Sequence, residues 1–179
     1  MGEEKKPRKV KLFFALLFSD EDTLQKTEKR LMHDFGEIDT RSIIFPFHHT
    51  SYYEKEMGSD LFKRFISIKP LIKRDELPGI KKHTNLLENL FAYDNQSRTV
   101  NIDPGYLTDS KMILATTKDY SHRIYIGKKI FAEVTLHYSA KEKSYIPWEW
   151  TYPDYQDKIA LEYFNELKKI YKDDLRREQ

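Results

Sequence analysis

The stretch SHRIYIGKKIFAEVTL, residues 121–136, predicts the β-hairpin around which we expect the rest of the fold to be arranged. Apolar and polar residues alternate along it, which is typical of strands that bury one face. If the loop holds two residues within 127–129, partners across the two strands have opposite index parity. His122 then shares a face with Glu133, and Arg123 lies on the other, more apolar face. A three-residue loop would instead exchange the faces of one strand.

A histidine beside a glutamate on a sheet face suits general acid–base chemistry, because a nearby carboxylate moves the imidazole pKa within the useful range. His122 and Glu133 are therefore candidate catalytic residues. Lys118 and Arg123, which lie close to them in the sequence, are candidate ligand-binding residues that would contact an anion. The alternative is a solvated cross-strand pair, which would contribute from a few tenths of a kcal/mol to about 1 kcal/mol of stability.

The segment RTVNIDPGY, residues 98–106, supplies a second polar set. Arg98, Asn101 and Asp103 project along one predicted strand. The letters DPGY then predict a type II turn that presents Tyr106. We expect Asp103 to assist catalysis, and Arg98 and Tyr106 to contact the ligand. The alternative for Asp103 is that it only caps its own turn.

Residues 74–94 predict a helix that carries two stripes, with Pro78 in its first turn. The apolar stripe, at spacings of four and three residues, faces the core. A polar stripe with the same spacing lies beside it, and its Lys81 is a further candidate ligand-binding residue. The apolar stripe consists of Ile80, Thr84, Leu87 and Phe91, and the polar stripe of Lys81, Asn85 and Glu88.

The remaining segments complete an α+β pattern. Residues 10–18 predict a strand buried on both faces. Residues 19–35 predict a helix with a capping-box start, which Gly36 ends. Further strands are expected within residues 40–47 and 61–72, and a last helix near residues 154–175, while residues 108–117 are ambiguous between helix and strand.

This order favours a single-domain sandwich of a mainly antiparallel sheet with about three helices, ferredoxin-like in its first part. A doubly wound parallel sheet fits less well, because several connections are too short for a crossover. We expect one domain over residues 1–179, with frayed tails at residues 1–9 and 176–179.

The composition of the chain argues against several classes of function. The 31 basic and 29 acidic residues nearly cancel, so the chain as a whole does not attract nucleic acid. The lack of cysteine excludes disulfides, thiolate metal sites and a cysteine nucleophile. The apolar run at residues 12–18 is too short for a membrane span and no small-residue cleavage site follows it, so we expect a cytoplasmic protein without a membrane partner.

Two further segments are rich in histidine or aromatic residues. In HHTSYY, residues 48–53, adjacent histidines on a strand point to opposite faces, so we expect no metal site there or at the other histidines, whose spacing is unsuitable. This segment could line a cleft instead. In WEWTYPDY, residues 148–155, the aromatic rings could stack on a base or sugar, or could pack the last helix on the sheet.

The blocks NIDPGYLT, SHRIYI, AEVTL and WTYPDY resemble a bacterial family known only as a domain of unknown function, some members of which carry an automatic GTP-binding label. The resemblance covers nearly the whole chain and implies a stand-alone bacterial domain of this length. It transfers no catalytic role, and the cofactor stays unknown. No G-x-x-x-x-G-K-[ST] phosphate loop occurs in the chain, so nucleotide binding would need another route.

Three functions fit these observations. The first is an enzyme or binding domain for a phosphorylated or nucleotide-like small molecule. The second is an RNA-binding module, against which the near-neutral charge argues. The third is a structural or protein-interaction domain with a polar network in its core. The first predicts that the candidate side chains converge on one pocket: His122, Glu133, Asp103, Arg98, Lys118, Arg123, Lys81 and Tyr106.

Overall fold

The computed structural model describes residues 2–48, 54–92 and 98–178. Its nine strands are β1 (Val10–Phe18), β2 (Ile38–Arg41), β3 (Phe45–Phe47), β4 (Leu61–Ile72), β5 (Val100–Leu107), β6 (Lys111–Thr116), β7 (Ile124–Gly127), β8 (Ile130–Ser139) and β9 (Ser144–Pro147). They form one antiparallel sheet in the order β2-β4-β1-β5-β6-β8-β7, with β3 beside β4 and β9 beside β8. The α+β class and the antiparallel sheet are therefore confirmed.

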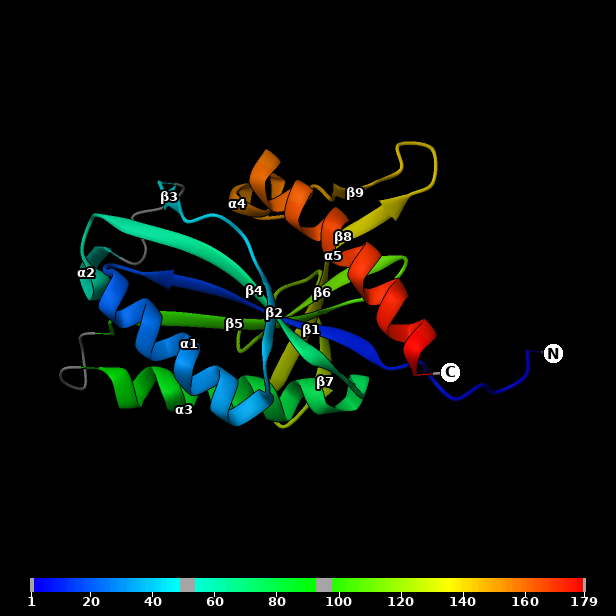
Figure 1. The fold of residues 1–179 in the computed structure, drawn as a ribbon, viewed down its shortest axis with the longest axis horizontal. Helices are drawn as coiled ribbons and strands as arrows, with labels where there is room; N and C mark the ends of the chain where they lie inside the picture. The colour runs from blue at the N-terminus through cyan, green and yellow to red at the C-terminus, as the bar shows by residue number, and fades with distance from the viewer. Residues whose placement is uncertain (1, 49–53, 93–97, 179) are drawn as a thin grey trace.

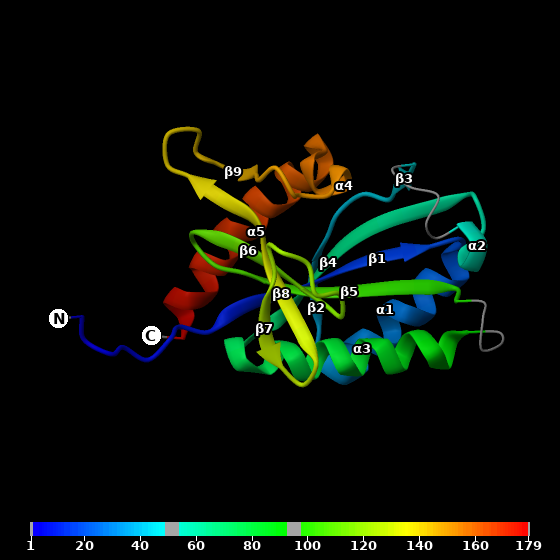
Figure 2. The ribbon, with the colours of Figure 1, turned by 180° about the vertical axis from the view of Figure 1, so that it is seen from behind.

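Three long helices cover the two faces of this sheet, as Figures 1 and 2 show. They are α1 (Glu21–Phe35), α3 (Leu77–Phe91) and α5 (Lys158–Arg177), and two single-turn helices are α2 (Glu54–Met57) and α4 (Pro153–Gln156). Alternate residues of β1 enter two separate cores: Phe14 packs with α1 and α3, and Phe13 packs with α5. This explains why β1 is apolar except for Lys11, because neither of its faces meets water.

Most predicted elements are present, with small shifts. Asp20 is the N-cap of α1 and accepts a hydrogen bond from the Thr23 amide (2.8 Å), and Gly36 follows the helix with φ of 109°. The ambiguous residues 108–117 contain strand β6, and the last helix is divided at Asp157 into α4 and α5. The ferredoxin-like first part stays a prediction.

In the part of the chain that the structure describes, no helix is both long and apolar enough to cross a membrane.

The predicted turn at DPGY is wrong, because these residues continue β5. The amide and carbonyl of Ile102 point away from β1, so the nitrogen of Pro104, two residues on, points to the same side. Among the described residues no strand pairs with that stretch on this side, so the missing N–H of Pro104 costs no ladder hydrogen bond. Gly105 is there for close packing, since a Cβ would lie 2.4 Å from the Ile113 carbonyl oxygen. Tyr106 consequently lies within the strand.

The hairpin of β7 and β8 has the expected two-residue turn, but its register differs from the prediction. Lys128 and Lys129 have φ of 54° and 64°, as a type I′ turn requires. The register then shifts at Ile126, so that Ile124 lies opposite Ala132. One extra residue in β7 reverses the face of the sheet to which each residue before Ile126 points. The predicted separation of Arg123 from Glu133 is therefore wrong.

The sheet forks between β5 and β6. Residues 105–107 pair with residues 112–114, and the pairing stops there. Beyond this point β5 stays beside β1 as far as Val100, whereas β6 stays beside β8 as far as Thr116. Figure 2 shows β5 lying along β1 and β4, with β8 crossing their direction steeply. In the part of the chain that the structure describes, the fork therefore leaves residues 100–104 of β5 without a strand partner on this edge.

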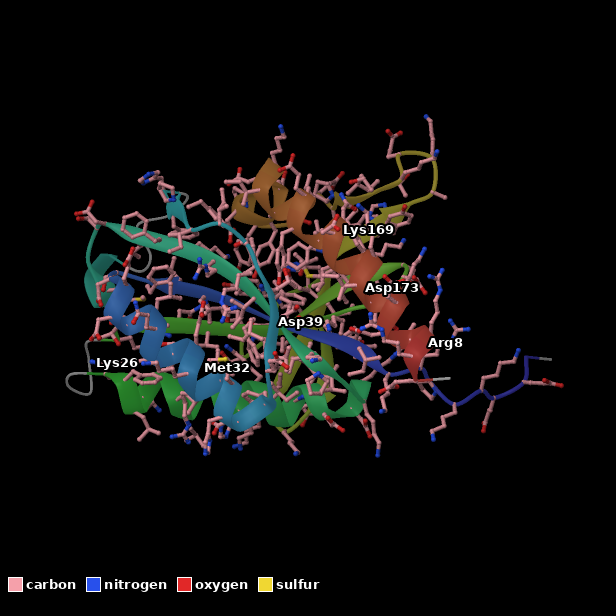
Figure 3. The ribbon with its side chains drawn as sticks, in the orientation of Figure 1. Arg8, Lys26, Met32, Asp39, Lys169 and Asp173 are labelled. Atoms are coloured by element: carbon pink, nitrogen blue, oxygen red, sulfur yellow. The ribbon has the colours of Figure 1, made fainter. Side chains whose placement is uncertain are left out.

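Near the edge of the sheet that β2 forms, a buried lysine connects three elements. Lys11 of β1 forms ion pairs with Asp39 of β2 and, at 2.7 Å, with Asp174 of α5. Asp39, labelled in Figure 3, also accepts a hydrogen bond from Ser67. Both carboxylates are thereby bonded to neighbours, so we interpret this cluster as structural.

Candidate functional site

A cavity of about 740 Å³, here named the fork cavity, occupies the opening between β5 and β6. Its walls come from β1, β4, α3, β5, β6, β8 and the segment around α4. The structure brings together at this cavity most of the residues singled out from the sequence. Those that line it are Lys81, Arg98, Asp103, Lys118, Arg123 and Glu133.

The polar stripe of α3 covers the unpaired edge of β5. Glu88 Oε1 accepts a hydrogen bond from the Ile102 amide at 2.8 Å, and Lys81 Nζ donates to the Ile102 carbonyl at 3.2 Å. A buried backbone amide or carbonyl without a partner costs free energy, so these two side chains take the place of a neighbouring strand. Asn85 completes the predicted stripe, and all three residues line the fork cavity.

Asp103 is the carboxylate at the base of the fork cavity. Lys81 Nζ lies 2.9 Å from Asp103 Oδ1, and the amide of Asn101 donates to Oδ2 at 2.7 Å. Burial alone would raise the pKa of Asp103, but the charge of Lys81 and these hydrogen bonds lower it below its ordinary value. The side chain is 33% exposed, so an ionised carboxylate faces the cavity.

Arg98 connects the cavity wall to α2 and α3. Its Nη1 lies 3.0 Å from Glu88 Oε2 and its Nη2 lies 2.6 Å from Glu56 Oε2. Burial raises the pKa of Glu88, against the opposing effect of Lys81. These two ion pairs hold the Arg98 guanidinium in place. Because 26% of the side chain is exposed, a ligand in the cavity can still reach it.

Arg123 is buried under the β6–β7 connection, with 2% of its side chain exposed. Its Nε donates to Glu133 Oε2 at 2.8 Å, its Nη1 to the Lys118 carbonyl at 3.2 Å, and its Nη2 to the Tyr152 hydroxyl at 3.2 Å. The guanidinium also lies 4.3 Å from the centre of the Tyr120 ring. Arg123 therefore holds the segment that carries Lys118 in position.

His122 contacts Glu133, as predicted, but it lies outside the fork cavity. Its Nε2 is 3.2 Å from Glu133 Oε2. Its ring stacks on Trp150, which stacks on Trp148, which in turn stacks on His137, with centroid distances of 5.6, 5.2 and 4.0 Å. His122 and Tyr106 line a different cavity, which contains neither Asp103 nor Lys118.

The ion pair of Lys63 and Asp154 in the fork cavity was not predicted from the sequence. Lys63 of β4 is buried and bonded to Asp154 of α4, and its Nζ lies 4.2 Å from the centre of the Tyr155 ring. The sequence does contain a signal for Lys63, which lies inside the largely apolar strand LFKRFISI. A lysine at such a position is buried only when it has a partner, so an ion pair could have been expected. Asp154, 91 residues away in the chain, carries no comparable signal.

Within residues 2–48, 54–92 and 98–178, no three histidine or acidic side chains gather as metal ligands would. His48 is exposed at the end of β3. His49 and the rest of the predicted cleft segment, up to residue 53, lie outside the described residues. The expectation of a metal-free protein stays a prediction.

The fold and the fork cavity together define an α+β domain with a forked antiparallel sheet and one polar, ligand-sized cavity at the fork. The chain belongs to the family described as a domain of unknown function, DUF4416, which matches residues 8–171. The resemblance seen in the sequence blocks is thereby confirmed. No curated protein and no solved structure matches the chain.

Proposed function

We propose that the fork cavity binds a phosphorylated or nucleotide-like small molecule. The observation that carries this proposal is the convergence on one cavity of cations, carboxylates and amides that are far apart in the sequence. The volume of about 740 Å³ lies within the range of roughly 300–1,000 Å³ that is usual for small-molecule sites.

The lining suits a ligand that carries both an anionic group and hydrogen-bond donors. Arg98 and Lys118 supply donors for a phosphate, to which a guanidinium binds well. Asp103 stays ionised at neutral pH and accepts hydrogen bonds from ligand hydroxyl or amino groups. Because the cavity also contains Glu88, Glu133 and Asp154, a simple polyanion fits less well than a sugar phosphate or a nucleotide.

The aromatic rings near α4 do not favour the RNA-binding alternative. Single-stranded RNA is held largely by bases that stack on open aromatic faces. Here Trp150 is stacked with His122 and with Trp148, and Trp148 is also stacked with His137, while each tryptophan is 38% exposed. These rings are therefore already partly occupied by one another.

Isothermal titration and thermal unfolding with inorganic phosphate, ribose 5-phosphate, ATP and GTP test the proposal. A ligand present at 100 times its Kd stabilises the fold by about 2.7 kcal/mol. We expect at least one phosphorylated probe to bind, and Lys118→Ala and Asp103→Asn to weaken that binding. Lys141→Ala removes a lysine whose side chain is 92% exposed, outside the cavity, and is the matched control.

Absence of binding by all four probes would contradict the proposal, as would equal affinities in the three variants. The structural-domain alternative predicts that result: Asp103→Asn would then lower the unfolding temperature without changing any ligand affinity. Circular dichroism at the titration temperature confirms that each variant is folded before its affinity is compared.

A further inference from the structure

A second cavity, of about 460 Å³, shares the lining residue Glu133 with the fork cavity. On β6, Ile113 lines the second cavity, whereas Leu114 and Ala115 line the fork cavity. The hairpin turn reaches the start of α3 beside this cavity, because a Cβ on Gly79 would lie 3.3 Å from Lys128 Nζ. We name it the hairpin cavity.

Apolar side chains form most of the wall of the hairpin cavity. Several of them belong to a buried cluster that is separate from the two main cores. They come from the start of α3 and from β6, β7 and β8. The apolar lining residues are Leu77, Pro78, Ile113, Ile124, Ile126, Ala132 and Val134. A wall of this kind takes up the apolar part of a ligand.

The cations of the hairpin cavity differ from those of the fork cavity. Lys63, Lys81, Arg98 and Arg123 in the fork cavity are each bonded to a carboxylate. Arg74 and Lys111 line the hairpin cavity, and among the described residues neither has a carboxylate within ion-pair distance. Arg74 Nε donates a hydrogen bond to the Arg8 carbonyl at 3.3 Å. These two cations can therefore bind an incoming anion without breaking an existing ion pair.

Other polar groups of this cavity are compatible with an anion. Tyr106 carries a hydroxyl whose pKa is raised by burial, against the opposing effect of nearby Arg74, so it stays a neutral donor. Glu133 is held by Arg123 and His122. Asp75 is exposed.

We propose that the hairpin cavity is a second ligand site, for an amphipathic anion: a compact apolar body that bears one carboxylate or phosphate group. The apolar body lies against the wall formed by α3, β6 and β8, and the anionic group meets Arg74 and Lys111. The site is independent of the ligand proposed for the fork cavity. The two cavities share one carboxylate, Glu133, whose Oε2 contacts both Arg123 and His122.

Three probes with the same eight-carbon chain test this site: octanoate, octanol and octylammonium, each titrated calorimetrically into the whole chain. We expect octanoate to bind most tightly and with a stoichiometry of one. Arg74→Met and Lys111→Met keep an unbranched apolar stem and remove the charge, and each should weaken octanoate binding about tenfold, as loss of a charged hydrogen bond does. Lys141→Met is the matched control and should bind as the wild type does.

Tryptophan emission gives an independent signal, because His122 lines the cavity and stacks on Trp150. Octanoate should change this emission with the same midpoint as the heat signal. Equal affinities for the three probes, a stoichiometry well above one, or unchanged octanoate affinity in both Met variants would overturn the proposal. Phosphate or nucleotide binding is measured separately, so failure of either site is distinguishable from failure of the other.

Discussion

Replacement of Glu133 by glutamine tests the buried ion pair that separates the two cavities. Arg123 and Glu133 are each 2% exposed at the side chain, and their Nε and Oε2 atoms lie 2.8 Å apart. Breaking a buried pair while one charge remains typically costs about 3–5 kcal/mol. Glutamine keeps the size of the side chain and one acceptor oxygen, so we expect a loss near the lower limit, about 3 kcal/mol.

For a chain of this size, each kcal/mol lowers the unfolding temperature by roughly 2–4 °C, so Glu133→Gln should unfold roughly 6–12 °C lower. Urea unfolding followed by circular dichroism gives the free energy directly. Glu162→Gln is the matched control, because that carboxylate is 66% exposed and its pair with Lys158 spans 3.6 Å. Its effect should stay below about 1 kcal/mol.

The double variant Arg123→Met, Glu133→Leu completes the test. An apolar pair of similar volume is often as stable as the ion pair it replaces, so the double variant should recover much of the loss seen in Glu133→Gln. If Glu133→Gln unfolds within about 1 kcal/mol of the wild type, the carboxylate does not hold Arg123 as described, and the reasoning about this pair is wrong.

Three further predictions concern packing and pH. Gly105→Ala places a Cβ 2.4 Å from the Ile113 carbonyl oxygen, so overpacking should cost about 1–3 kcal/mol in urea unfolding, and an unchanged midpoint would contradict the close contact. Burial alone would raise the pKa of Asp34, but hydrogen bonds from Arg30 and two histidines lower it well below 3.8. The folded state therefore binds fewer protons there, and stability should fall as the pH drops below about 4, less steeply in Asp34→Asn. Burial lowers the pKa of Lys168 to about 8 from 10.5, so stability should rise between pH 8 and 9.5, and Lys168→Met should abolish that rise.

The sequence predicted those parts of the site in which a local pattern determines where a side chain points. Lys81, Asn85 and Glu88 recur at helical spacing, and spacing alone places them on one side of α3. The contact between His122 and Glu133 is also present as predicted, although the hairpin register from which it was predicted is wrong. For α3 the inference depends only on backbone geometry within one element.

The sequence did not predict features that depend on where strand pairing stops. The irregularity at Ile126 leaves the alternation of apolar residues intact, so nothing local signals that Arg123 changes face. Pro104 and Gly105 are typical of a turn, yet the same residues suit an unpaired edge and a close strand contact. The pair of Lys63 and Asp154 forms only through the tertiary fold.

The fork has a consequence for the order in which the chain acquires its binding site. One wall of the fork cavity is complete once β5 has been synthesised, and the other wall needs β6, β8 and α4. During vectorial synthesis the first wall, including Ala15 and Leu17, is therefore made before residues 111–155, which complete the cavity. A ligand in this cavity would bind only after the two walls have met, and so would stabilise a late step of folding rather than an early one.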